Sequence, residues 1–147
     1  MGAGKVDDKM NMLLRTRTEP GSLHAKVSGP FSLDEAKRTF LEILEAIVQH
    51  KMDKVLIDGR EIEGEPTTIE RFIYSEFAAT ATRMLRERMA LPKPPQFACV
   101  LQEPVLDPMR FGETVAVNRG MHVKVFDDLE DALRWLGVEK TRIGGTD

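Results

Sequence analysis

Several residue types and motifs that would point to a particular chemistry are scarce or missing. The 147 residues include one cysteine, one tryptophan and one tyrosine. A single cysteine excludes an internal disulfide framework and any zinc or iron–sulfur site built from several cysteines. No run of about 18 apolar residues occurs, so we expect no membrane span. The polar stretch 1–9 also lacks the apolar core of a signal peptide. Together these features predict a cytoplasmic protein.

The charges are nearly balanced. There are 21 basic and 24 acidic residues, for a net charge of −3, which argues against a dedicated nucleic-acid binder. No two histidines have metal-ligand spacing, and no phosphate-binding glycine loop or Gly-x-Ser-x-Gly motif is present. We therefore predict no metal, no cofactor and no catalytic residue, and an enzyme of unrecognised class is kept only as an alternative.

Turn residues and apolar periodicity divide the chain into short strands and helices. The length suggests one domain, which we place at residues 10–138, with flexible ends at 1–9 and 139–147. We expect strands at 11–18, 23–28, 54–58, 96–101 and 122–126, and helices beginning near Ser32, Thr67, Asp107 and Asp127. This β-β-α-β-α-β-α-β-α order predicts an α/β fold with a mixed, mostly parallel five-stranded sheet. The first two strands form a hairpin, because Pro20-Gly21 suits a type II turn.

Three helices carry the signature of a capping box at their N-terminus. Ser32 with Glu35 and Thr67 with Glu70 have the spacing at which a hydroxyl and a carboxylate each bond the other residue's backbone N–H. Asp127 with Glu130 repeats the spacing. Gly112 interrupts the next-to-last helix, and glycine is unfavourable in a helix interior.

The long helix from Thr67 to about Met89 has an unusually wide apolar surface. Its apolar residues cover about 200° of the helix circumference, whereas a one-sided surface helix needs about 100°. They are Ile69, Phe72, Ile73, Tyr74, Phe77, Ala81, Met84 and Leu85. A sheet alone cannot cover this surface. We therefore expect a second subunit, intrachain packing or an apolar ligand to cover the rest, and we take Phe72, Tyr74 and Phe77 as contact candidates.

Asp58 and Arg60 form a second candidate contact. They follow a buried strand, at the carboxyl end where open α/β sheets bind ligands. The alternative is an ordinary turn at the end of the strand, with Gly59 supplying backbone freedom. Elsewhere, Cys99 is expected to be buried in a strand, and His24 to lie on a solvent-exposed strand face.

The element order, with 55–58 before a capped helix, resembles the STAS fold of anti-sigma-factor antagonists and of sulfate-transporter tails. The stretches 111–120, 122–126 and 130–136 are similar to those of STAS-like bacterial proteins of unassigned function, relatives in fold of the CRAL-TRIO lipid-binding domains. The resemblance covers roughly residues 10–138. It implies a bacterial, non-enzymatic regulatory domain that works through protein contact.

The resemblance also implies a candidate regulatory site. Anti-sigma-factor antagonists carry an Asp-Ser pair before the matching helix, and a partner kinase phosphorylates the serine. Here Pro66 and Thr67 stand at those positions, and Thr68-Ile69 replaces the usual Gly-Leu. Thr67 and Thr68 are the phosphorylation candidates. For Thr67 we favour a plain helix cap, because the nearby Glu61, Glu63 and Glu65 would repel a phosphate, and Thr68 is no better placed.

Two functions from different classes follow. The first is a regulatory domain that works through protein–protein contact, as a homodimer and with a possible regulatory protein partner. The second is the binding or sensing of a small apolar, lipid-like molecule. Both depend on the wide apolar surface of the long helix.

Overall fold

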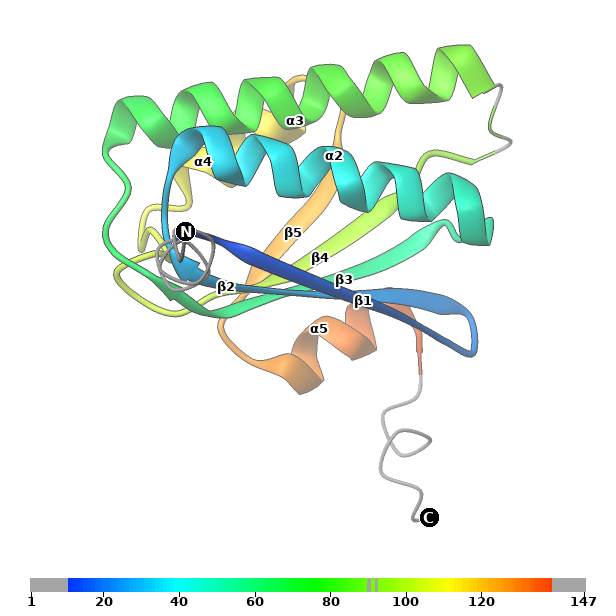
Figure 1. Ribbon diagram of the computed structural model, residues 1–147, viewed down its shortest axis with the longest axis horizontal. Helices are drawn as coiled ribbons and strands as arrows, with labels where there is room; N and C mark the ends of the chain where they lie inside the picture. The colour runs from blue at the N-terminus through cyan, green and yellow to red at the C-terminus, as the bar shows by residue number, and fades with distance from the viewer. Residues whose placement is uncertain (1–10, 90, 92, 139–147) are drawn as a thin grey trace, which may run out of the picture.

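The computed structural model describes residues 11–89, 91 and 93–138 (Figure 1). The predicted flexible ends lie outside these residues. The described elements follow the predicted order. They are β1 (Leu13–Glu19), β2 (Ser22–Pro30), α2 (Leu33–His50), β3 (Lys54–Glu63), α3 (Thr68–Met89), β4 (Gln96–Val100), α4 (Phe111–Asn118), β5 (His122–Phe126) and α5 (Leu129–Leu136).

The five strands form one mixed sheet in the order β1-β2-β3-β4-β5. Only β1 and β2 pair antiparallel, through the predicted turn, where Gly21 has a φ of 84°. The predicted α/β class and mixed sheet are confirmed. β3 is longer than predicted, because its charged second half continues to pair with β2 beyond a register shift between Lys26 and Ser28.

The helices cover the two faces of the sheet unequally. α5 lies on one face, whereas α2, α3 and α4 lie on the other (Figure 1). On the α2 face, Leu23, Val55 and Phe97 are fully buried. On the α5 face, Leu56 and Val100 pack among the apolar residues of α5. Alternate residues of each inner strand therefore contribute to different cores, as the pleat of a strand requires.

α3 is one continuous helix that packs mainly on α2 and α4, which lie between it and the sheet (Figure 1). Its most buried residues are small: Ser75, Ala78, Ala79 and Thr82. The small residues let the helices approach closely. At the crossing with α4, a side chain at Gly112 would place its Cβ 2.9 Å from Ser75 Oγ, so this glycine serves helix packing.

The helix ends confirm some predictions and correct others. Thr67 and Glu70 form the complete capping box. The Thr67 backbone nitrogen is 2.9 Å from Glu70 Oε1, and the Glu70 backbone nitrogen is 3.1 Å from Thr67 Oγ1. α5 is capped by Asp128 rather than Asp127. α4 begins at Phe111, later than predicted, because the Asp107 carboxylate accepts hydrogen bonds from the backbone N–H groups of Met109 and Phe111.

His24 is buried, contrary to the prediction, with only 6% of its surface exposed. It lies beside Leu56 in the sheet register. Its Nε2 is 3.1 Å from the hydroxyl of the buried Ser22, and its Nδ1 is 3.4 Å from a guanidinium nitrogen of Arg17. Burial first, and then the charge of Arg17, lowers the pKa of His24.

We expect His24 to make the fold less stable in acid. Its pKa in the folded protein lies below 6.5, the ordinary value for histidine in an unfolded chain, so the unfolded chain takes up the proton first as the pH falls. The full free energy of unfolding is therefore present above the unfolded pKa of His24, and part of it is lost as the pH falls toward the folded pKa. Urea denaturation should show that His24→Gln loses less unfolding free energy than wild type between pH about 7 and about 5.

Identical pH slopes for wild type and His24→Gln would contradict the assignment.

Candidate functional site: a cavity beneath α3

A cavity of about 180 Å³ lies between the sheet and the helices α2, α3 and α4. Ile57 of β3, Cys99 of β4 and Val123 of β5 contribute to its floor, and Phe40 of α2 lies at its side. α3 contributes Tyr74, Ser75 and Ala78. Most of the wall is therefore apolar, which is typical of small-molecule sites.

The cavity follows from how the helices are placed. α2 packs on β1 and β2, and α4 packs on β5, so the middle of the sheet is covered from above by α3 (Figure 1). The α3 residues at the cavity include Ser75 and Ala78, whose side chains are too short to fill the space. The large apolar side chain that would fill a normal core is missing there.

The charged residues at the cavity wall are bonded to nearby backbone. Arg71 donates to the carbonyl oxygens of Val105 and Pro104, at 2.7 and 2.9 Å, and so ties α3 to the loop before α4. Arg110 donates to the carbonyl oxygen of Val125. Glu113 accepts from the N–H of the same residue at 3.0 Å.

The two ionisable groups deeper in the cavity stay protonated. Burial, with a smaller contribution from the charge of Glu113, raises the pKa of the Cys99 thiol to about 12. Burial also raises the pKa of the Tyr74 hydroxyl well above its usual value of 10.0. Both residues thus present neutral groups to the cavity, and the thiol is a weak nucleophile at neutral pH.

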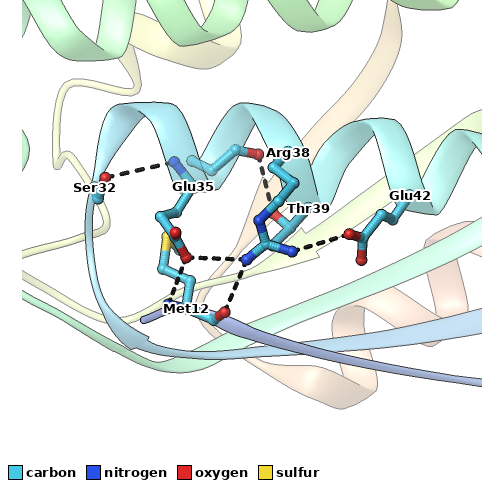
Figure 2. Close-up of polar contacts among 7 residues, drawn as sticks. Met12, Ser32, Glu35, Arg38, Thr39 and Glu42 are labelled. Atoms are coloured by element: carbon cyan, nitrogen blue, oxygen red, sulfur yellow. Dashed lines mark hydrogen bonds and ion pairs between the residues drawn. The ribbon is translucent and has the colours of Figure 1, made fainter. Parts of the chain in front are cut away.

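The chain segment before β1 is tied to α2 beside the cavity (Figure 2). Met12 is 2% exposed and lines the cavity. The Glu35 carboxylate accepts from the Met12 N–H at 3.0 Å and from Arg38 at 2.9 Å, and Arg38 also donates to the Met12 carbonyl at 3.1 Å. The Ser32 hydroxyl accepts from the Glu35 N–H at 3.4 Å. The predicted capping box is therefore only half formed, because the Glu35 side chain is used to hold Met12.

Of the three aromatic candidates on α3, only Tyr74 lines the cavity. Its ring meets Phe40 edge to face, with centroids 6.2 Å apart. Phe72 instead stacks on Phe111 at 6.5 Å, and Phe77 lies under the ammonium group of Lys37 at 5.4 Å. Phe72 and Phe77 are thus half-buried by packing within the chain.

Asp58 and Arg60 lie outside the cavity wall and bind each other. The guanidinium donates to the carboxylate at 2.9 and 2.8 Å, and the Arg60 N–H donates to it at 3.2 Å. Burial acts to raise the pKa of Asp58, but the Arg60 hydrogen bonds outweigh burial and lower it. The hydrogen bonds also raise the pKa of Arg60. Their role as a ligand contact stays a prediction.

The two threonine candidates are exposed at the start of α3. The Thr67 hydroxyl accepts the Glu70 N–H as a helix cap. Thr68 is the first residue of the helix. Phosphorylation of either residue stays a prediction.

Sequence reasoning missed most of the cavity wall. Val105, Leu106, Gly112 and Ala116 come from segments where no site was predicted. One usable signal was present, namely the small residues at 75, 78, 79 and 82, whose helical spacing places a continuous row of short side chains on the inner face of α3.

A family model described as SpoIIAA-like matches residues 22–137. No curated protein matches the sequence. The chain is similar in structure to an anti-sigma factor antagonist from Mycobacterium paratuberculosis, with 16% identity and a TM-score of 0.55 over 86% of this chain and 95% of that one.

It is also similar to an uncharacterized protein of the DUF3478 family with a SpoIIAA-like fold from Shewanella loihica. The identity is 16% and the TM-score 0.50, over 86% of this chain and 93% of that one. These likenesses confirm the predicted STAS-like fold. No helix among the described residues has the length and apolar character needed to cross a membrane.

We expect the Glu35 contact to stabilise the fold more than a surface ion pair does. Glu35→Ala removes the acceptor of the partly buried Met12 N–H, which should lower the free energy of unfolding by about 1–3 kcal/mol. Glu42→Ala is the matched control, because within the described part of the chain its carboxylate binds Arg38 alone, at 2.9 Å, in an exposed pair. This control should cost less than about 1 kcal/mol. Equal losses in urea denaturation would contradict the role assigned to Glu35.

Proposed function

We propose that this chain, which belongs to the SpoIIAA-like family, is a non-enzymatic binding domain. It would hold one small apolar molecule beneath α3. The observation that carries the proposal is the apolar cavity of about 180 Å³ between the helices and the sheet. An engineered apolar cavity of about 150 Å³ in another protein stays free of water and binds benzene. The volume found here suits a ligand of comparable size.

The chemistry of the wall supports binding rather than catalysis. The described residues that line the cavity include no histidine, and their one thiol, Cys99, is held protonated by burial. Arg71, Arg110 and Glu113 are engaged with backbone groups. A ligand in this cavity would mainly meet apolar atoms, and its binding would be driven by the removal of apolar surface from water.

Filling the cavity should abolish binding of an apolar probe. Toluene should raise the melting temperature of the wild-type protein, because a ligand that binds only the folded state stabilises it. Ala78→Phe places a ring in the cavity and should remove this rise. Ala81→Phe is the matched control, because it makes the same change on α3 at a half-buried position that does not line the cavity.

Two further results complete this test. Cys99→Leu reduces the cavity from the sheet side and should also weaken the toluene effect, which guards against misfolding of the first variant. If toluene leaves the melting temperature of the wild-type protein unchanged, or shifts that of Ala78→Phe as strongly, the proposal is wrong.

A second function is favoured by exposed apolar residues on the outer side of the same helices. On α3, Ile69 is 69% exposed and Met84 is 49% exposed. Near and on α4, Met109 is 82% exposed and Val117 is 47% exposed. Large apolar side chains that are exposed on a helix supply apolar area that a protein partner can cover. The structural relative described as an anti-sigma factor antagonist supports a protein partner, and a second copy of this chain is the simplest one.

Association through α3 can be tested by light scattering. We expect a wild-type dimer at tens of micromolar, which the charged variant Ile69→Lys converts to a monomer. Leu41→Lys changes a residue of α2 that is 45% exposed and should leave the dimer intact. A monomeric wild-type protein at that concentration would refute self-association.

A further inference from the structure

Two hydroxyl groups of α3 border the cavity without a hydrogen-bond partner among the described residues. They belong to Tyr74 and Ser75, which both line the cavity. Every fully inaccessible polar side-chain atom of the described chain has a partner, so these two oxygen atoms keep some accessible surface. Tyr74 is half-buried. Ser75 is 8% exposed, which leaves little room for contact with bulk water.

The other polar groups around the cavity are already satisfied. The Thr39 hydroxyl donates to the Ala36 carbonyl at 2.9 Å. Ser75 Oγ lies at the crossing of α3 and α4, where a Cβ at position 112 would be 2.9 Å from it; glycine there leaves room for the hydroxyl at the edge of the cavity. Removing a hydroxyl from water without giving it a hydrogen-bond partner costs free energy. A ligand that supplies the partner therefore recovers free energy that a purely apolar ligand cannot.

The charges at the cavity disfavour an anionic ligand. The lining contains two arginines and three carboxylates. Arg110 and Glu113 lie 3.7 Å apart as an ion pair. The field of Glu113 contributes to the raised pKa of Cys99, and so acts against negative charge inside the cavity. A carboxylate placed there would lose its hydration, and it would have to compete with Glu113 for Arg110 and with the carbonyls of Val105 and Pro104 for Arg71.

On the basis of the proposed function, we infer that the ligand is a compact, neutral molecule of about phenol size with one hydrogen-bonding group, bound by the hydroxyl of Tyr74 and assisted by that of Ser75. The apolar walls hold the body of the molecule. The hydroxyls orient it and select against both hydrocarbons and acids of the same shape.

Phenol, toluene and benzoate test this inference by isothermal titration calorimetry on the full chain. Phenol and toluene have nearly the same shape and differ in the hydroxyl. Tyr74→Phe should weaken phenol binding by about threefold to tenfold, the equivalent of one net hydrogen bond. It should change toluene binding by less than about twofold, and benzoate should not bind. Ser75→Ala should weaken phenol binding in the same direction with toluene again unchanged.

A spectroscopic signal adds a test that a purely structural role would not affect. Tyr74 is the one tyrosine of the chain, so the difference between the spectra of wild type and Tyr74→Phe separates its near-ultraviolet band from that of Trp135. Cyclohexanol, which is transparent there, should shift this band in wild type, and cyclohexane should not.

The outcomes separate this inference from the proposed function. If toluene binds but Tyr74→Phe affects phenol and toluene equally, or neither, the inference is wrong and the proposed function stands. Benzoate binding as tight as that of phenol would also overturn the inference. If no probe binds to the wild-type protein, both fail.

Discussion

The packing of α3 on α2 and α4 through short side chains is the constraint on which the rest of the structure depends. Ser75, Ala78, Ala79 and Thr82 allow the three helices to approach closely. Two of them, Ser75 and Ala78, line the cavity and leave the middle of the sheet covered but not filled. Protein interiors are normally packed as densely as organic crystals, so an apolar space of about 180 Å³ represents lost dispersion contacts that a bound molecule would restore.

Hydrogen bonds from charged side chains to backbone groups hold the segments around the cavity in place. Arg71 fixes the loop before α4, and Arg110 and Glu113 join α4 to β5. Glu35 and Arg38 hold Met12 against α2 on the other side (Figure 2). These side chains satisfy backbone groups that have no partner in the sheet or helices. They shape the walls and leave the two hydroxyls of α3 as the polar groups that face the interior.

The element order and the mixed sheet could be predicted from the sequence, because they depend on local patterns. The alternation in β2, the capping box of Thr67 and Glu70, and the glycine after α5 act within a few residues. Predictions that depended on tertiary contacts were less successful. His24 follows the alternation of a polar strand face, yet it is buried, and Glu35 bonds to Met12, which is 23 positions away. Neither the burial of His24 nor the hydrogen bond between Glu35 and Met12 can be predicted from the residues next to them in the sequence.

The candidate site was predicted in outline only. The excess apolar surface of the long helix indicated that something besides the sheet covers it, and Tyr74 was correctly placed among the residues of interest. Phe72 and Phe77 showed the same periodicity, but they pack against Phe111 and Lys37. The volume of the cavity depends on which helix covers the middle of the sheet, and the sequence pattern of α3 alone cannot specify that.

The central claim is that the space beneath α3 is a dry, apolar cavity in the folded protein. A crystal structure determined under xenon pressure tests it directly, because xenon enters apolar cavities that water does not fill. The account predicts a xenon peak bounded by Tyr74, Ala78 and Cys99. Ordered water filling this volume, or α3 lying against the sheet with no space left, would contradict it.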